Sequence, residues 1–158
     1  MRKSSVADAV IVRFDSMLRA AFGVGMHQRR PSPAKGLPES PMSASEKRHT
    51  VGLMRVNHCG EVCAQALYVG QAALSRNTAT RTALLNAARE EGDHLFWCAE
   101  RLQELDSEGS LLNAFWFAGS FAIGVTAAAA GDKWSMGFVE ETEHQVVRHL
   151  QGHLGELP

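Results

Sequence analysis

Apolar residues recur at helical spacing along most of the chain and mark out its helical segments. Residues three, four and seven apart share one face of a helix, and such stripes run through residues 46–75, 79–106 and 134–153. Residues 111–130 form a further, almost wholly apolar segment. Strand-like alternation of apolar and polar positions is nearly absent. The pattern therefore predicts an all-α protein.

The pattern changes ahead of these helices. Residues 6–24 alternate apolar and charged positions as in a short amphipathic helix, which would pack on the domain or lie on a membrane surface. Residues 30–45 hold four of the five prolines and read as a linker or wrapping arm. We therefore expect two parts, an N-terminal helix with a proline-rich arm at residues 1–45 and a helical bundle at residues 46–158.

The apolar segment at residues 111–130 allows three interpretations. It carries no charge, and about 20 apolar residues suffice to span a bilayer. Its glycines, alanines and scattered polar residues also suit close packing between helices. It could be a true membrane span, a bundle helix with one exposed apolar face, or a plain core helix. The second interpretation suits a protein that sits on a membrane and handles an apolar ligand.

A carboxylate and an imidazole fall inside the apolar stripe of residues 79–106. Glu91 and His94 lie one helical turn apart on that stripe, whereas Asp93 falls beside or behind it. A buried carboxylate needs a cation or hydrogen-bond donors. A metal ion would satisfy both side chains, and a simple Glu–His hydrogen bond at the core edge is the alternative, since short Glu-x-x-His matches arise by chance. The stripe consists of Leu84, Ala87, Ala88, Leu95, Cys98, Leu102 and Leu105.

Two more predicted helices turn a glutamate inward. Glu61 falls on the packed side of its helix, with a hydrogen-bonded, half-exposed glutamate as the alternative. Its neighbour Gly60 is unfavourable in a helix by about 1 kcal/mol, so we expect it to mark the close approach of another helix. Glu143 falls on the stripe of the last helix, and Glu140 and Glu141 lie off the centre of that stripe. The stripe consists of Met136, Val139, Val146, Val147 and Leu150.

Composition narrows the classes of function. The chain has 158 residues with 16 basic and 17 acidic side chains, and its formal net charge of -1 argues against a nucleic-acid partner. Its three cysteines have no disulfide or zinc-like spacing, which suits a reducing compartment. There is no Gly-rich nucleotide-binding loop. Three inward glutamates and one histidine instead match carboxylate-bridged di-iron bundles, whose oxygen and imidazole ligands suit iron or manganese better than zinc.

Several motifs, in order along the chain, resemble the demethoxyubiquinone hydroxylase family of ubiquinone biosynthesis. The resemblance implies a ferritin-like bundle with two iron ions. It also implies a membrane-bound monooxygenase that uses O2 to hydroxylate the ring of a polyprenyl benzoquinol, with NADH as an electron donor. The motifs are RPSPAKGLPE, LMRVNHCGEVCAQALY, EEGDHLFWCAERL, LLNAFWFAGSFAIG and GFVEETEHQVVRHL.

The resemblance also assigns roles to individual residues and a place in the cell. It implies a peripheral protein on the cytoplasmic face of the inner (cell) membrane, acting as a homo-oligomer or within a ubiquinone-biosynthesis complex. Glu140 would replace Glu143 as a ligand if the pairing slipped by three residues. The implied iron ligands are Glu61, Glu91, His94 and Glu143, and Tyr68 and His149 would pass protons or electrons near the centre.

The family pattern continues into another helix with a second Glu-x-x-His pair, which this sequence does not show before Pro158. We therefore expect a bundle lacking the last ligand-bearing helix, with an incomplete second iron site or a second subunit that completes it. Two alternatives to the enzyme remain. One is a bundle that stores iron, and the other is a catalytically impaired remnant that only binds iron or quinone.

Overall fold

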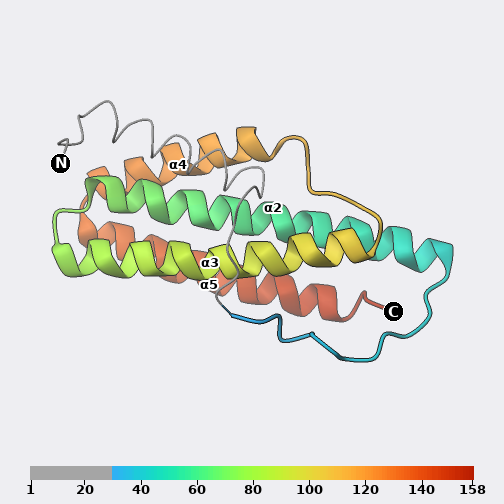
Figure 1. Ribbon diagram of the computed structural model, residues 1–158. Helices are drawn as coiled ribbons and strands as arrows, with labels where there is room; N and C mark the ends of the chain where they lie inside the picture. The colour runs from blue at the N-terminus through green and yellow to red at the C-terminus, as the bar shows by residue number, and fades with distance from the viewer. Residues whose placement is uncertain (1–29) are drawn as a thin grey trace, which may run out of the picture.

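The computed structural model describes residues 30–158, and within them the chain forms helices and no strand (Figure 1). This confirms the predicted all-α class. The amphipathic helix expected at residues 6–24 lies outside the described residues. The helices are α2 (Ala44–Leu74), α3 (Thr78–Glu104), α4 (Asn113–Ala129) and α5 (Asp132–Leu154).

Local sequence explains where the helices begin and end. Ser43 starts α2 with a capping box, in which its hydroxyl accepts the N–H of Glu46 and the Glu46 carboxylate accepts the N–H of Ser43. The Asn77 side chain accepts two N–H groups of the first turn of α3. Gly131 separates α4 from α5 with a φ of 114°, a conformation that favours glycine.

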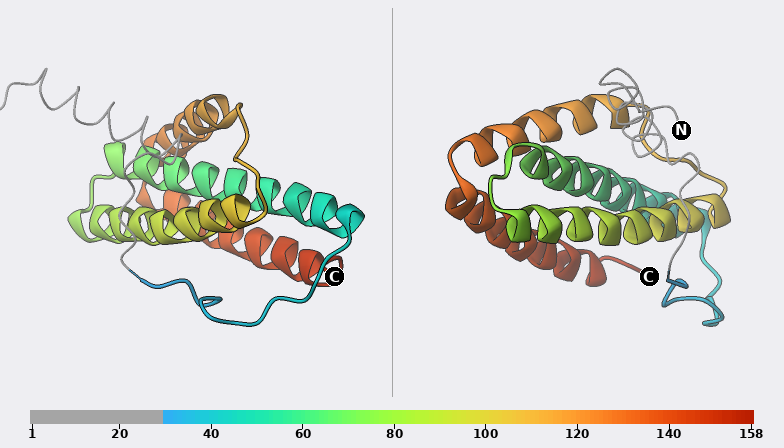
Figure 2. Two further views of the ribbon diagram at one scale, coloured as in Figure 1. Left: turned by 45° about the vertical axis from the view of Figure 1, so that its right-hand side comes forward. Right: turned by 60° about the vertical axis from the view of Figure 1, so that its left-hand side comes forward.

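Helix α2 is the central element of the bundle. It packs along α3 on one side and along α4 on another, and both views of Figure 2 show it between them. Helix α5 follows α4 through the turn at Gly131 and contacts both α4 and α2. Functional side chains on α2 can therefore reach partners on every other helix.

Glycines set the close crossing of α2 and α4. A Cβ atom at Gly124 would lie 2.2 Å from the backbone oxygen of Leu67, and one at Gly70 would lie 2.4 Å from the backbone oxygen of Phe121. Only glycine fits at these two positions without moving backbone. The expectation for Gly60 was wrong, because a Cβ atom there would meet nothing within 4 Å. The close approach lies further along the same helix.

Helix α4 is a bundle helix with one exposed apolar face, the second of the three interpretations of this segment. Phe117, Gly124 and Ala128 are buried. Among the helices of residues 30–158, none has the length and apolar character needed to cross a membrane. The exposed apolar side chains of the segment are Leu111, Leu112, Phe115, Trp116 and Ile123.

Helix α5 turns a different side to the bundle from the one that its apolar stripe predicted. Only Ser135 is buried on this helix. The stripe residues Met136, Val147 and Leu150 are exposed, and Val139 and Val146 are half-buried. The stripe assignment was therefore wrong for most of α5. The inward side of α5 instead combines polar contacts to α2 with Val139, which packs against the buried core.

Candidate metal centre

Three of the four predicted ligands converge where α2 faces α3. Glu61 comes from α2, and Glu91 and His94 come from adjacent turns of α3. Each offers one ligand atom, and these atoms all lie within 4.8 Å of one another. His94 Nδ1 lies 3.0 Å from Glu91 Oε2 and 3.8 Å from Glu61 Oε2. The spacing Glu91-x-x-His94 places a carboxylate and an imidazole side by side, and the packing of α2 on α3 adds the second carboxylate.

The charges of this group are strongly coupled. The two carboxylate side chains are only 14% (Glu61) and 11% (Glu91) exposed. Burial raises the pKa of Glu61 to about 7. Burial would raise the pKa of Glu91 as well, but hydrogen bonds from His94 and Glu61 hold it below its usual range. Hydrogen bonds to the two carboxylates raise the pKa of His94 to about 10.

This donor set fits a divalent cation. Among these three residues, the protonated His94 is the positive charge that lies beside both carboxylates, Glu91 and Glu61. A divalent ion supplies the positive charge that two buried carboxylates need. Two hard oxygens with one imidazole suit iron or manganese. The residues present therefore fit the iron of the di-iron class.

We expect metal uptake by this group to release protons. A metal ligand must be deprotonated, and His94 carries its proton up to a pKa of about 10. Between the pKa of Glu61, about 7, and that of His94, one proton leaves for each metal bound, so affinity should rise about tenfold per pH unit. Below the pKa of Glu61 a second proton leaves and the rise is steeper. Calorimetry of Fe²⁺ binding, without oxygen and in buffers of different ionisation enthalpy, measures this count; a pH-independent affinity would contradict it.

The fourth predicted ligand, Glu143, is exposed and contacts the buried Tyr68. Tyr68 is fully buried, and its hydroxyl donates to Glu143 Oε1. Burial first, then Glu143, and to a smaller degree Glu91 and Glu61 raise the pKa of Tyr68, so its phenol stays protonated. Within the part of the chain that the structure describes, Glu143 is not among the three converging ligands. Its contact with Tyr68 places it near them, since the charges of Glu91 and Glu61 also act on the Tyr68 hydroxyl.

The structure places the other predicted residues of the last helix further from the cluster. His149 lies six residues beyond Glu143, roughly 9 Å along the helix axis. Its ring is exposed and packs against His153, with 4.0 Å between the ring centroids. The rival ligand Glu140 is exposed. Neither is among the converging ligands of the described residues.

The spacing of apolar residues did not predict that Asp93 of α3 is buried and makes a polar contact. Asp93 was expected beside or behind the stripe, yet it is only 3% exposed and accepts a 2.9 Å hydrogen bond from Arg30 Nε. Trp97 Nε1 donates to the backbone oxygen of Arg30, and the guanidinium lies 5.5 Å from the Trp97 ring centroid. The proline-rich arm thus covers a second side of α3. The signal in the sequence was Asp93 followed four residues later by Trp97, on one helical face.

A helical bundle with a carboxylate–imidazole cluster at its centre is typical of the ferritin-like di-iron class. Residues 48–158 match the family described as "Ubiquinone biosynthesis protein COQ7", and the chain belongs to this family. The family is a ferritin-like di-iron family, which confirms the predicted fold class and the di-iron assignment at the level of the family.

Sequence comparison gives many similar proteins with the same name. The chain is 58% identical over 151 residues to the 3-demethoxyubiquinol 3-hydroxylase of Paracidovorax citrulli, which covers 96% of this chain and 73% of the relative. It is 54% identical over 156 residues to that of Nitrosococcus oceani, covering 99% and 73%. It is 57% identical over 153 residues to that of Cupriavidus pinatubonensis, covering 96% and 73%. No solved structure matches the chain.

Proposed function

We propose that this chain is a 3-demethoxyubiquinol 3-hydroxylase, an enzyme of ubiquinone biosynthesis. It hydroxylates the ring of a demethoxy-polyprenyl benzoquinol with O2. The observation that carries the proposal is the convergence of Glu61, Glu91 and His94 in a chain of the COQ7 family. Two iron ions, when bound, supply the redox chemistry that activates O2.

The residues of the chain have distinct tasks in this proposal. Glu61 and Glu91 supply oxygen ligands and His94 a nitrogen ligand, from two helices packed directly on each other. Tyr68 holds a proton on a buried hydroxyl beside these ligands, and Glu143 accepts its hydrogen bond. A protonated group at this position can deliver a proton to a reacting oxygen. His149 would serve a proton or electron path that enters along α5.

The two alternatives find less support. An iron-storage bundle has no evident use for the exposed apolar side chains of α4, Leu112, Phe115 and Trp116 among them. An impaired remnant is not favoured by any described residue, because the converging ligands are present and the relatives are named as enzymes. The prediction that two further ligands are missing stays a prediction.

Product analysis tests the proposal directly. The full chain, loaded with Fe²⁺ and given a demethoxyquinol and ¹⁸O2, should form a quinol that carries one ¹⁸O atom. The second oxygen atom leaves as water, which requires two electrons from a reductant and two protons, at least one of them from solvent. We propose NADH as that reductant, so a matched reaction without NADH should stop after at most one turnover. Iron uptake with no hydroxylated product would overturn the proposal in favour of a binding or storage bundle.

We further propose that the exposed apolar face of α4 rests on the bilayer, on the cytoplasmic face of the inner membrane. Support comes from Trp116 and Ile123 on one face of α4 and from Leu112 at its N-cap, which continues that face; all three are exposed. Such a face would let a prenylated ring pass from the lipid to the protein. Single apolar residues on a surface are common, but a row of them on one helix marks an interaction site.

Liposome binding checks the membrane proposal with a matched pair of variants. Ile123 on α4 is 51% exposed and Val56 on α2 is 52% exposed. Ile123→Glu should lower binding to liposomes about tenfold, the equivalent of one buried aliphatic side chain. Val56→Glu should leave binding unchanged. Equal binding by both variants and the unsubstituted chain would contradict the proposal.

A further inference from the structure

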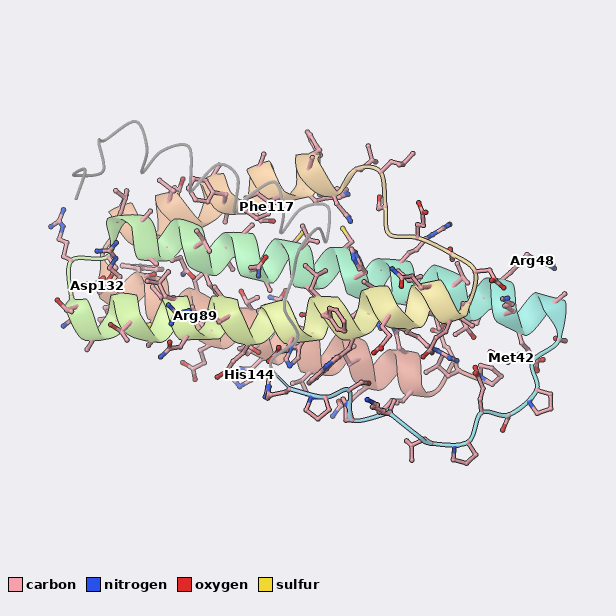
Figure 3. All side chains as sticks on the ribbon, viewed as in Figure 1. Met42, Arg48, Arg89, Phe117, Asp132 and His144 are labelled. Atoms are coloured by element: carbon pink, nitrogen blue, oxygen red, sulfur yellow. The ribbon has the colours of Figure 1, made fainter. Side chains whose placement is uncertain are left out.

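Helix α5 is attached to the bundle by several polar contacts and by Val139, which packs against the buried core. At its start, the Asp132 carboxylate accepts hydrogen bonds from Ser75 Oγ at 2.6 Å and from the backbone N–H of Asn77 at 3.1 Å. Figure 3 labels Asp132 at the end of the bundle where α2 turns into α3. All three residues are partly or fully exposed. Asp132 lies three residues before Ser135 on the same side of α5, so these contacts hold the start of the helix against the turn between α2 and α3.

Gln71 makes the buried contact between α2 and α5. Its side chain is fully buried, and Nε2 donates a 2.7 Å hydrogen bond to the backbone oxygen of Ser135, the only buried residue of α5. The backbone of Gln71 is held from another side, since a Cβ atom at Gly124 of α4 would lie 3.0 Å from the Gln71 nitrogen. Gln71 therefore lies where α2, α4 and α5 meet, and its amide has little freedom to follow α5 if that helix shifts.

The same side of α2 carries Tyr68, three residues before Gln71. The two helices run antiparallel here, because Tyr68 contacts Glu143 while Gln71 contacts Ser135. Ser135 and Glu143 are eight residues apart, roughly 12 Å along α5, whereas Tyr68 and Gln71 are roughly 4.5 Å apart along α2. Helical side chains lean toward the N-terminus of their own helix, so the Tyr68 and Glu143 side chains lean toward each other and close the difference. A slip of α5 by one residue would separate them.

We propose that Gln71 is a positioning residue that sets the register of α5 on α2 and so brings Glu143 to Tyr68 beside Glu61 and Glu91. The inference deepens the proposed function, on which it rests for the role of Glu143 at the metal centre. Gln71 itself touches no ligand of the cluster in any contact that the structure gives. It acts through the backbone of Ser135, two helical turns from Glu143.

The test uses the fact that Tyr68 is the only tyrosine of the chain. The intensity ratio of the tyrosine doublet in the UV Raman spectrum of the full chain reports whether this phenol donates to a carboxylate. Gln71→Met keeps the length of the side chain and removes the donor. Glu143→Gln gives the reference value for loss of the carboxylate. Gln65→Met is the matched control, because Gln65 on the same helix donates in the same way to the Ala88 backbone oxygen of α3, at 3.2 Å.

We expect Gln71→Met to move the ratio most of the way to the Glu143→Gln value, with Gln65→Met unchanged. The side chain in Gln71→Asn is one methylene too short to reach Ser135, so this variant should change the intensity ratio in the same way. It replaces Gln71→Met in the test if Gln71→Met does not fold. An unsubstituted-like ratio in a folded Gln71 variant would overturn the proposal. An equal change of the ratio in Gln65→Met would also overturn the proposal, because it would show that losing any such hydrogen bond of α2 disturbs the packing around Tyr68. The Raman measurement needs neither iron nor turnover, so failure of the proposed hydroxylation would leave its outcome intact.

Discussion

Replacing Glu91 with alanine will abolish stoichiometric iron binding and lower hydroxylation about a thousandfold, a loss of roughly 4 kcal/mol of transition-state stabilisation. Glu91 is the ligand that contacts both other members of the group: His94 donates to it, and Glu61 shares a hydrogen bond with it. Its removal leaves His94 with one carboxylate partner at 3.8 Å. The ligand count then falls below what holds a divalent ion in a protein site.

The control for this experiment is Glu90→Ala. Glu90 precedes Glu91 on α3 and carries the same charge, but it is exposed and lies outside the converging group of the described residues. It should bind iron and turn over as the unsubstituted chain does. Iron content by metal analysis and product formation by mass spectrometry give the two readouts. Full iron binding by Glu91→Ala would show that Glu61, Glu91 and His94 are not the ligand set.

Gly124→Ala will destabilise the fold by at least about 2 kcal/mol and lower the unfolding temperature by roughly 4–8 °C. The new Cβ atom would lie 2.2 Å from the Leu67 backbone oxygen and 3.0 Å from the Gln71 nitrogen. Both neighbours are backbone atoms inside α2 and cannot rotate away. Relief therefore requires α4 to move off α2, which uncovers buried apolar side chains such as Phe117.

Gly119→Ala separates this steric effect from helix propensity. Gly119 lies on the same helix, and a Cβ atom there would meet nothing within 4 Å. Alanine is favoured over glycine in a helix by about 1 kcal/mol, so this variant should be as stable as the unsubstituted chain or slightly more stable. Urea unfolding followed by circular dichroism gives both values. A Gly124→Ala chain as stable as Gly119→Ala would show that α2 and α4 are further apart than the structure has them.

Much of the fold, and the inward direction of Glu61, Glu91 and His94, could be inferred from the spacing of apolar residues along the chain. The helix bounds follow from apolar spacing and capping residues, which are local properties of the chain. The pair Glu91 and His94 lies on a stripe of large apolar residues, so geometry within one helix was enough to turn it inward. Glu61 was found in the same way, and the packing of α2 on α3 then brought the three together.

The rest depends on contacts between helices, which spacing within one helix cannot report. The sequence offers several glycines in helical segments, and only the crossing of α2 and α4 distinguishes Gly124 from Gly60. Asp93 is buried because the arm lies over it, and periodicity treats a helix as having one buried side. The side of α5 that faces the bundle is centred on Ser135, which accepts a hydrogen bond from the Gln71 amide, and the apolar spacing within α5 gives no sign of that contact.

Local stability is unevenly distributed in this bundle, since α5 contributes a single buried residue, Ser135. Lifting α5 would break its polar contacts to α2 and remove Val139 from the core, whereas parting α2 from α3 or α4 would separate most of the buried apolar residues. Lifting α5 would leave Glu61 and Glu91 together and would separate Glu143 from Tyr68. The half of the bundle that holds the carboxylate pair is therefore expected to resist local unfolding more than α5 does.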